Sequence, residues 1–494
     1  MRNTLELLTT CAQSFETHDA VVDGDERVTY GEFYDRVARM AGCISAAGIA
    51  HPKVLINLPQ GIDAYVAMFA THMAGGFYCP LNLEHPANRK RQISNIFEPD
   101  VILTRENLED GFTASSPSLR VLNLDDLTDD APLELPRPAH ELAYVMFTSG
   151  STGEPKGVMI GRSALAHYAD WAGRAMAITP HDRWSQHPNI GFDLSVLDIY
   201  GALCHGACLY PIKGVKGRLV PAELIEEFQL TIWNSVPSVV DVMSKRDQLT
   251  SAYLKSLRLM TFCGEPLLPE HLEGIFAARP DIKVHNTYGP TEATVSCTLL
   301  ELTAQNYREF CRNNVSFGTP IEGMTLTLEG GDNLGEGEIV ISGPQVAHGY
   351  WGRVDLTENA FAGKASAGGG RNSYRTGDWA EVLADNFYFM QRVDRQIKRR
   401  GHRIELGDID AAIRRYTKSA TCTVYVEDKL ISFIEDHNSG ADLELRKWLS
   451  QQLPEYCLPD AIRGIATLPK NANDKIDVQR LQEIVLTNNE GAVN

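Results

Sequence analysis

A loop rich in glycine and hydroxyl groups carries the clearest chemistry in the chain. Residues 144–160 read YVMFTSGSTGEPKGVMI, an apolar run followed by this loop. Its glycines let backbone amides approach an anion closely, its hydroxyls can donate hydrogen bonds, and its lysine adds a positive charge. These residues are Thr148, Ser149, Gly150, Ser151, Thr152, Gly153, Lys156 and Gly157. The loop is therefore predicted to hold a polyphosphate; a plain surface loop, the alternative, fits this density of donors poorly.

The loop does not match the phosphate loop of ordinary NTPases, because GxxxxGK[ST] occurs nowhere in the sequence. TSGSTGEPKG at 148–157 instead resembles the phosphate-binding signature of the ANL superfamily of acyl- and aminoacyl-adenylate-forming enzymes. Six further segments resemble motifs of that family, in family order, across nearly the whole chain: 28–33 (VTYGEF), 286–294 (NTYGPTEAT), 337–350 (GEIVISGPQVAHGY), 374–379 (YRTGDW), 392–409 (RVDRQIKRRGHRIELGDI) and 469–477 (PKNANDKID). The residues in these motifs resemble those of stand-alone amino-acid adenylation domains of nonribosomal peptide (antibiotic) biosynthesis. FCGEPLLPEHL at 262–272 is particularly similar to D-alanine:carrier-protein ligases.

The resemblance implies ATP and Mg²⁺ as cofactors and assigns roles to five residues. Glu292 matches the magnesium-binding glutamate and Thr291 a contact to the α-phosphate. Tyr288 matches the residue whose ring lies against adenine. Asp378, which by itself would be interpreted as a turn residue, matches the carboxylate that accepts both ribose hydroxyls, and Arg392 matches a further ribose contact. The nucleotide site is expected to include Asn286, Thr287 and Gly289 as well.

Lys475 resembles the catalytic lysine of the family's C-terminal domain. Its ammonium would bridge the substrate carboxylate and the α-phosphate and so stabilise charge that develops in the transition state. Two departures from the family pattern stand nearby: Asp474 and Gln391 occupy positions that are usually glycine. The carboxylate of Asp474 either weakens the field of Lys475 or faces solvent.

Asp394 matches the family's hinge between a large and a small domain. The resemblance implies that the small domain swings after adenylation, which would remove Lys475 and bring Gly401 near a tunnel for a pantetheine thiol. The basic run KRRGHR at 398–403 has two open interpretations. It is either a solvated stripe or a contact for an acidic carrier protein.

Asp193 is the informative residue of the predicted amino-acid pocket. It stands in FDLSVL at 192–197, an apolar setting where a carboxylate is unfavourable unless it meets a cation. The α-ammonium of an amino acid would supply that cation, whereas aryl-acid, fatty-acid and luciferin-type relatives offer none. A helix-capping aspartate is the alternative. The remaining pocket positions, by motif, are Leu194, Leu197, Asn234, Thr261, Cys263, Gly264, Thr287, Val295 and Ser296.

These positions predict a small, uncharged substrate. No second carboxylate and no basic group is expected to face the pocket, so a charged side chain is disfavoured. Alanine, serine, threonine, cysteine and proline all fit. Cys263 favours D-alanine by resemblance, whereas Asn234 could hydrogen-bond a hydroxyl or thiol and so discriminate strongly for one.

The first 390 or so residues are predicted to form repeated strand–helix–strand units, which would position most of the site residues. KVLINL at 53–58 predicts a strand, 62–73 places Ile62, Tyr65, Val66, Phe69 and Met73 on one helical face, and 76–81 begins another strand. Such units predict an α/β fold with two parallel-rich subdomains. From about 314 to 392, strands at 337–342 and 386–393 between glycine-rich turns predict a small antiparallel barrel, with 363–370 as a loop.

The chain after residue 393 predicts a separate small, mobile α+β domain. Ile409, Ile413 and Tyr416 share one face of a short helix, and β-rich segments follow at 421–426 and 430–435. A helix from about Leu443 gathers Leu445, Trp448, Leu449 and Leu453 before Pro454 ends it. The expected domains are thus 1–393, which binds ATP and the amino acid, and 394–494, which carries Lys475.

Composition narrows the function classes. The 494 residues are 43% hydrophobic and 22% charged, and their formal charge of −18 argues against nucleic-acid and anionic-membrane partners. None of the ten cysteines forms a CxxC pair, and Cys204 and Cys208 are expected to be small buried side chains rather than zinc ligands. With no signal peptide or long apolar run expected, the predicted location is the cytoplasm.

The resulting hypothesis is an ATP-dependent amino-acid ligase. It would form an aminoacyl-AMP, release pyrophosphate, and load the amino acid onto the phosphopantetheine thiol of a carrier protein. The carrier is expected to act in trans, because the segment after Lys475 has no serine to bear a pantetheine arm. The alternatives are a ligase that uses free coenzyme A and a catalytically silent relative that binds nucleotide and regulates.

Overall fold

The structure is a computed structural model. It describes residues 2–106, 119–126, 136–137, 139–148, 154–331, 335–361, 373–392, 395–399, 401–437, 442–470 and 476–490. The chain divides into two compact units. The first comprises residues 1–82, 96–147 and 157–393, and the second comprises 83–95, 148–156 and 394–494.

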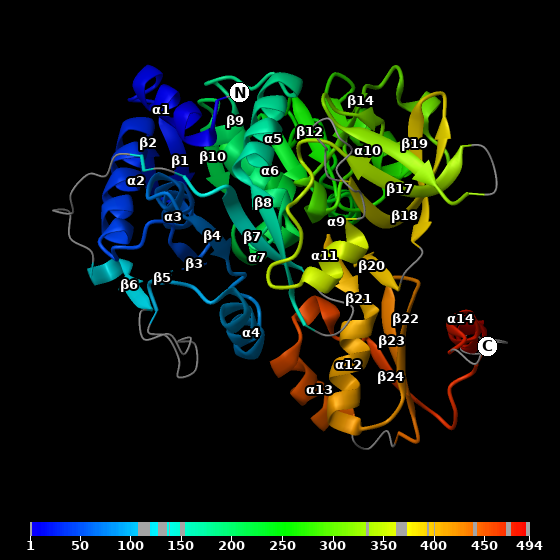
Figure 1. Cartoon of the computed structure of the whole chain (residues 1–494). Coiled ribbons are helices and arrows are strands. Elements are labelled where there is room, and N and C mark those ends of the chain that lie inside the picture. The colour runs from blue at the N-terminus through cyan, green and yellow to red at the C-terminus, as the bar shows by residue number, and fades with distance from the viewer. Residues whose placement is uncertain are drawn as a thin grey trace. The chain divides into compact units, whose positions relative to one another are not determined.

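A nine-stranded sheet forms the centre of the first unit (Figure 1). Its strand order is β15-β14-β13-β12-β11-β9-β10-β1-β2, and the inner strands pair in parallel, as predicted. The strands are β1 (Asp19–Asp23), β2 (Glu26–Thr29), β9 (Arg183–Gln186), β10 (Cys208–Pro211), β11 (Ile232–Ser235), β12 (Leu259–Phe262), β13 (Lys283–Asn286), β14 (Thr298–Leu302) and β15 (Thr319–Pro320). Helices of this part are α5 (Arg162–Ala175), α6 (Leu194–Leu203), α7 (Gly214–Leu219), α8 (Pro221–Phe228), α9 (Ser238–Lys245) and α10 (Pro269–Ala278).

A second, six-stranded sheet has the order β6-β5-β3-β4-β7-β8. Its strands are β3 (Lys53–Asn57), β4 (Phe77–Pro80), β5 (Val101–Thr104), β6 (Arg120–Asn123), β7 (Leu142–Thr148) and β8 (Lys156–Gly161). The helices near it in the chain are α1 (Thr4–Ser14), α2 (Tyr30–Ser45), α3 (Ile62–Met73) and α4 (Ala87–Phe97). The predicted strand at 53–58 and the helix at 62–73 are therefore confirmed.

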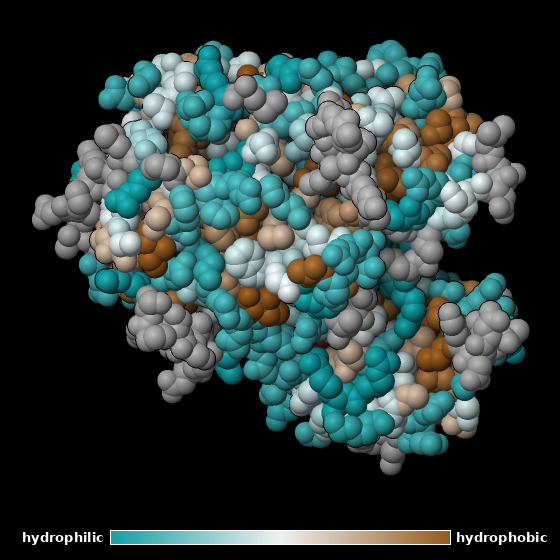
Figure 2. Space-filling view, in the orientation of Figure 1, coloured by the Kyte–Doolittle hydropathy of each residue, from teal (hydrophilic) through white to brown (hydrophobic). Residues whose placement is uncertain are grey.

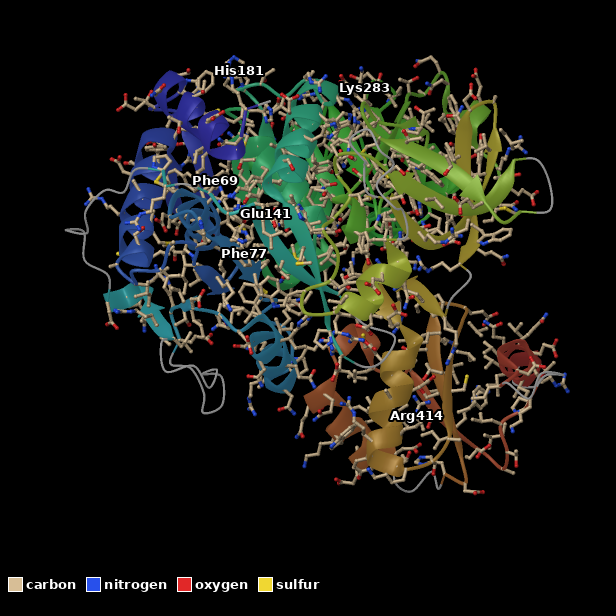
Figure 3. The ribbon with its side chains drawn as sticks, in the orientation of Figure 1. Phe69, Phe77, Glu141, His181, Lys283 and Arg414 are labelled. Atoms are coloured by element: carbon tan, nitrogen blue, oxygen red, sulfur yellow. The ribbon has the colours of Figure 1, made fainter. Side chains whose placement is uncertain are left out.

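Helix α3 is more deeply buried than its one predicted apolar face. Every residue of α3 except Asp63 is buried, because α2 packs on one side of it and β3 and β4 on another. Phe69 of α3, labelled in Figure 3, shows how the layers meet. Its ring centroid lies 6.0 Å from that of Phe33 in α2 and 5.0 Å from that of Tyr200 in α6. One continuous hydrophobic core therefore joins the helices of the two sheets.

A four-stranded antiparallel sheet stands where the small barrel is predicted. It has the order β16-β17-β18-β19, from β16 (Thr325–Glu329), β17 (Glu336–Ser342), β18 (Ser373–Leu383) and β19 (Asn386–Arg392), with α11 (Val354–Ala360) before β18. The pairings among the described residues give this open order rather than a closed ring. The predicted loop at 363–370 lies outside the described residues.

The second unit contains the predicted α+β elements. These are β20 (Gln396–Arg399), β21 (His402–Glu405), α12 (Leu406–Thr417), β22 (Thr421–Val426), β23 (Lys429–Glu435), α13 (Asp442–Gln452), β24 (Ala461–Ile465) and α14 (Val478–Glu490). Ile409 and Ile413 are buried as predicted, but Tyr416 is exposed and its ring lies 5.4 Å from that of Trp448. Tyr416 belongs to the last turn of α12, where the helix face that carries Ile409 and Ile413 reaches the surface.

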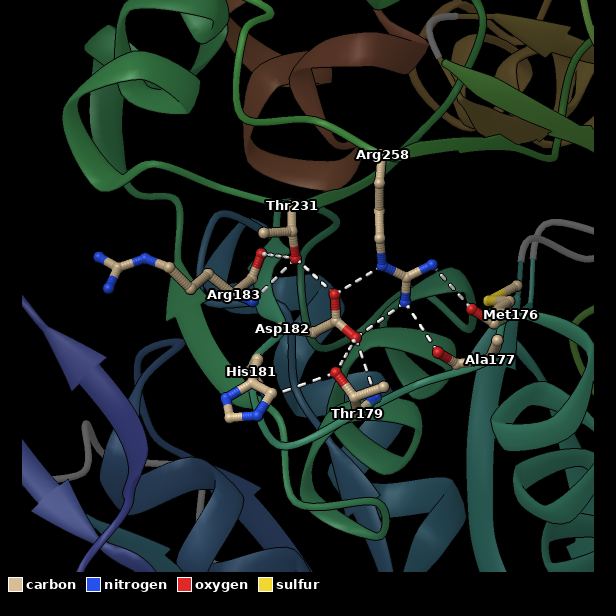
Figure 4. A network of polar contacts seen from close by, with 8 residues as sticks. All are labelled: Met176, Ala177, Thr179, His181, Asp182, Arg183, Thr231 and Arg258. Atoms are coloured by element: carbon tan, nitrogen blue, oxygen red, sulfur yellow. Dashed lines mark hydrogen bonds and ion pairs between the residues drawn. The ribbon is translucent and has the colours of Figure 1, made fainter. Parts of the chain in front are cut away.

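An ion-pair network holds the amino ends of three parallel strands (Figure 4). Arg258, which precedes β12, places Nε 2.7 Å from Oδ1 and Nη2 2.8 Å from Oδ2 of the buried Asp182, which precedes β9. Thr231, which precedes β11, donates its hydroxyl to Oδ1 at 2.7 Å. Burial alone would raise the pKa of Asp182, but hydrogen bonds from Arg258, Thr231 and Thr179 outweigh it and lower that pKa. The network thus lies at the end of the sheet opposite to the carboxyl ends, where parallel sheets usually bind ligands.

Few large apolar side chains are exposed in the part of the chain that the structure describes. Hydrophilic residues cover most of the face shown in Figure 2. Among the described residues, no helix is both long enough and apolar enough to span a bilayer. Cys204 and Cys208 are buried, as predicted.

Candidate active site

Tyr288, Asp378 and Arg392 meet in a buried polar cluster of the first unit. Asp378 of β18 pairs in register with Arg392 of β19, and the guanidinium of Arg392 contacts Oδ1 of Asp378. Tyr288, which follows β13, donates its hydroxyl to Oδ2 of Asp378 at 2.6 Å. Its ring centroid lies 4.5 Å from that of Phe317. Each oxygen of Asp378 therefore already accepts one hydrogen bond, and a carboxylate oxygen has room for a second acceptor contact.

The loop after β13 is held by side chains that the nucleotide prediction includes. Asn286 donates through Nδ2 to the carbonyl of Ser316 at 2.8 Å, and Thr287 donates its hydroxyl to the carbonyl of Phe262 at 3.0 Å. A Cβ at Gly289 would lie 2.6 Å from the Cα of Ser296, so only glycine permits this close approach. These three residues shape the loop that carries Tyr288.

Glu292 and Thr291 lie in a buried 3₁₀ turn at 291–293. Tyr350 donates its hydroxyl to Oε1 of Glu292 at 2.7 Å, and the amide of Ala347 donates to the carbonyl of Glu292 at 2.8 Å. The carboxylate of Glu292 is fully buried. A buried carboxylate is a suitable ligand for a magnesium ion, because an oxygen donor and the ion neutralise each other's charge.

Thr294 and Val295 have backbone φ angles of 55° and 70°, a region that side-chain-bearing residues, and β-branched ones above all, rarely adopt. Gln345, which is fully buried, stabilises this conformation. Its Nε2 donates to the carbonyls of Ser296 at 2.8 Å and Ala293 at 3.2 Å, and its Oε1 lies 2.9 Å from Nδ1 of His167. Gln345 was not among the predicted site residues. The feature of the sequence that could have pointed to it is a single glutamine in a mostly apolar stretch after β17.

Asp193 stands immediately before α6 and is buried. It occupies the helix N-cap position, but its backbone is already helical and its side chain makes no capping hydrogen bond. The alternative interpretation of Asp193 as a helix cap is therefore wrong. Leu194 and Leu197, which follow on α6, are buried as well.

The other predicted pocket residues come from the carboxyl ends of parallel strands and the loop after β13. Asn234 of β11 and Thr261 of β12 are register partners, and both are fully buried. Cys263 follows β12 and contacts the carbonyl of Val295 through its thiol, 3.8 Å away. Ser296 shares a hydrogen bond of 3.0 Å with the hydroxyl of Tyr168. Gly264 has a φ of 94°, which favours glycine.

A second carboxylate stands beside this pocket, contrary to prediction. Asn234 donates through Nδ2 to Oδ1 of Asp198 at 2.7 Å, and Trp184 donates to the same oxygen through Nε1 at 3.0 Å. Asp198 lies in α6 and is fully buried. The FDLSVL motif ends at Leu197, one residue before Asp198, so the motif did not include this carboxylate, although a single acidic residue inside an apolar helix is a visible signal.

Part of the predicted phosphate loop belongs to the second unit. Lys156, the first residue of β8, places Nζ 3.3 Å from Oε1 of Glu405, to which Gln396 also donates at 2.6 Å. Thr148, the last residue of β7, is half-buried. Ser149, Gly150, Ser151, Thr152, Gly153, Asp394, Asp474 and Lys475 lie outside the described residues.

The basic run at 398–403 is not a uniformly solvated stripe. Arg399 is buried, and its Nη2 lies 2.7 Å from Oδ2 of Asp460. His402 stacks on Tyr456 with ring centroids 3.7 Å apart. Gly401 has a φ of 78°, which suits the turn between β20 and β21.

Comparison with known proteins finds a matching family, similar chains and similar solved structures. Residues 8–351 match the family described as AMP-binding enzyme. The chain is 31% identical to an L-proline–[L-prolyl-carrier protein] ligase of Pseudomonas fluorescens, across 93% of this chain and 94% of that one. It is 30% identical to a D-alanine–D-alanyl carrier protein ligase of Bacillus licheniformis, across 97% and 99% of the two chains. The crystal structure of the Vibrio cholerae adenylation domain AlmE with glycyl-adenosine-5'-phosphate is 26% identical, with a TM-score of 0.82 and 98% of each chain covered.

Proposed function

The chain belongs to the family of AMP-binding enzymes, and from this premise we propose that it activates a small, uncharged amino acid with ATP and transfers it to a carrier protein. In the first step, a carboxylate oxygen of the amino acid attacks the α-phosphorus, and the bond from that phosphorus to pyrophosphate breaks. In the second step, a phosphopantetheine thiolate attacks the carbonyl carbon, and AMP leaves. The Pseudomonas and Bacillus relatives described above, which the chain matches over nearly their whole length, are both carrier-protein ligases by name, and this supports the assignment.

The observation that carries the proposal is the segment 286–296. Its first residues lead to Tyr288, whose hydroxyl binds Asp378 of the predicted ribose site. Its last residues, Val295 and Ser296, belong to the predicted pocket that begins at Asp193. One short segment thus contributes to both predicted sites, which is what a reaction between a nucleotide and an amino acid needs.

Two anions must meet in the first step, so charge neutralisation is the main task of the protein. Asp193 would bind the α-ammonium group of the substrate, and Asp378 with Arg392 would hold the ribose. Glu292, a buried oxygen donor, would bind Mg²⁺, which when bound neutralises phosphate charge. Lys156 and the other residues of the phosphate loop would hold the triphosphate, and Lys475 would stabilise the transition state.

We further propose the division into an ATP- and amino-acid-binding domain, 1–393, and a mobile domain, 394–494, that turns about Asp394. The turn would exchange Lys475 for Gly401 and so separate the two half-reactions. Because Arg399 is buried and paired with Asp460, other basic residues of the run would have to contact a carrier protein.

Amino-acid-dependent exchange of pyrophosphate into ATP, across the twenty common amino acids and D-alanine, tests the first half-reaction. Exchange that depends on a small, uncharged amino acid is expected, and exchange with none of them would refute the proposal. Transfer to a phosphopantetheinylated carrier protein and to free coenzyme A should then be compared. Efficient turnover with coenzyme A alone would favour the rival, a ligase that uses coenzyme A.

A further inference from the structure

Asp198, Asn234 and Trp184 form a fully buried polar network next to the predicted amino-acid pocket. Oδ1 of Asp198 accepts hydrogen bonds from Nδ2 of Asn234 at 2.7 Å and from Nε1 of Trp184 at 3.0 Å. The carbonyl of Leu194 lies 3.4 Å from Nδ2 of Asn234 as a second acceptor. Both of these acceptors require the amide nitrogen of Asn234 to face α6, so the network fixes the orientation of the amide.

Three oxygen atoms of this region have no hydrogen-bond partner among the described residues. They are Oδ2 of Asp198, Oδ1 of Asn234 and Oγ1 of Thr261. Each belongs to a side chain with no exposed surface. An unsatisfied buried polar group costs about 1–3 kcal/mol, so a further hydrogen-bond partner at these three oxygens would be favourable.

The three residues are neighbours in the fold. Asn234 and Thr261 are register partners on β11 and β12, so their side chains project from the same face of the sheet. Asp198 reaches that face from α6, where it lies four residues after Leu194 and therefore on the same side of the helix. Leu194, Asn234 and Thr261 are all predicted pocket residues. The unsatisfied oxygens thus lie where the side chain of a bound amino acid is expected.

We propose that these three oxygens recognise a hydroxyl or thiol on the substrate side chain, so that the enzyme selects serine, threonine or cysteine over alanine or proline. This inference rests on the proposed function and deepens it. A hydroxyl can donate to Oδ1 of Asn234 and at the same time accept from the hydroxyl of Thr261. An alkyl side chain can do neither and would leave all three oxygens unsatisfied.

The same network favours a neutral hydroxyl over an ammonium group. Burial raises the pKa of Asp198 well above its ordinary value, against the opposite effect of hydrogen bonds from Asn234, Trp184 and the backbone of His187. A raised pKa favours the protonated carboxyl, and a protonated carboxyl can donate a hydrogen bond. A hydroxyl can accept that bond, whereas an ammonium group has no acceptor. Asp198 therefore contributes in two ways: Oδ2 is offered to the substrate hydroxyl, and Oδ1 positions the amide of Asn234.

Pairs of amino acids of matched shape test this on the wild-type protein. The pairs are serine with alanine, threonine with valine, and cysteine with 2-aminobutyrate, each compared by kcat/KM in pyrophosphate exchange. The hydroxyl or thiol member of the best pair is expected to be favoured on the order of 10²-fold or more. Equal efficiency within every pair, or a preference for ornithine over threonine, would overturn the inference alone. Absence of exchange with every amino acid would overturn the proposed function as well.

Three variants then assign the selectivity to residues. Asn234→Leu and Thr261→Val should each reduce the preference at least about tenfold, and Asp198→Asn should reduce it through a loosened Asn234. Asn57→Leu is a matched control: Asn57 is a buried asparagine of β3 whose Oδ1 is likewise unsatisfied and whose Nδ2 donates to Thr104 at 3.2 Å. The control should change stability but not the preference. An unchanged preference in both Thr261→Val and Asp198→Asn would contradict the assignment.

Discussion

Arg392 and Arg395 lie three residues apart in the chain, yet each is held by a buried aspartate of a different compact unit. In the first unit, Arg392 contacts Asp378. In the second unit, Nη1 of Arg395 lies 2.7 Å from Oδ2 of Asp410. The two ion pairs bracket Asp394, the predicted hinge, which lies outside the described residues. Rotation about the proposed hinge would therefore break neither ion pair.

The two arginines should have separable effects. Arg392→Leu should raise the KM for ATP about tenfold, ~1.4 kcal/mol, because Asp378 loses the cation that orients it for the ribose. Arg395→Leu should leave that KM near the wild-type value and lower the free energy of unfolding by about 2 kcal/mol, since Asp410 stays buried without its partner. Pyrophosphate-exchange kinetics and urea unfolding measure the two quantities. An equal change of KM in both variants would argue against separate roles.

Lys475→Ala should slow adenylation by a factor on the order of 10² or more while sparing transfer from supplied aminoacyl-AMP. The reason is that the ammonium group is proposed to act only in the first transition state. Single-turnover assays of each half-reaction measure this, with Lys447→Ala, an exposed lysine of α13, as the control. Equal loss of both half-reactions would contradict the proposed domain movement.

Asp193→Ala should abolish amino-acid activation, because the α-ammonium group of the substrate would enter an apolar site without a counter-charge. ATP binding, followed by calorimetry, should be retained. Asp170→Ala, at a half-buried surface aspartate that pairs with Arg174, serves as the control and should activate amino acids normally. Selectivity for α-amino acids that survives in Asp193→Ala would show that another group binds the ammonium.

Gln345→Met should reduce both activation and stability, the latter by about 2–4 kcal/mol, since three carbonyls of the 293–296 loop lose their donor. Without that donor, Thr294 and Val295 are expected to relax from their left-handed conformation and displace Ser296. Gln248→Met, at another buried glutamine of the first unit, should affect stability only. Comparison of the KM for the amino acid with the unfolding midpoint separates the two effects. A normal KM in Gln345→Met would rule out a positioning role.

Asp182 should make the protein sensitive to acid. The pKa of Asp182 is lowered in the folded state, so its network stabilises the fold above about pH 4, which is the ordinary pKa of an aspartate in an unfolded chain. This stabilisation is lost as the pH falls through the pKa that Asp182 has in the folded state. Asp182→Asn should therefore be less stable than wild type at pH 7, and the difference should shrink as the pH falls toward about 3. Urea midpoints across this range measure the effect. Asp25→Asn, at an exposed turn, should show no such convergence, and a constant difference for Asp182→Asn would contradict the prediction.

The sequence by itself determined the order of the motifs and most of the elements that carry them. The alternation of strand and helix predicted β3 and α3 correctly, and the apolar context of Asp193 pointed to a buried carboxylate. These features are local: a helical or extended period is written in neighbouring residues, because hydrophobic burial repeats with the geometry of the element.

Only the tertiary structure decided which polar groups meet. Tyr288 and Asp378 are 90 residues apart in the chain, and Asp198 and Asn234 are 36 apart. Sequence spacing gives no register between β11, β12 and α6, so neither the second carboxylate beside Asn234 nor the support of the 293–296 loop by Gln345 could be predicted. Hydrogen bonds act over about 3 Å, and the approach of these groups depends on how whole sheets and helices pack.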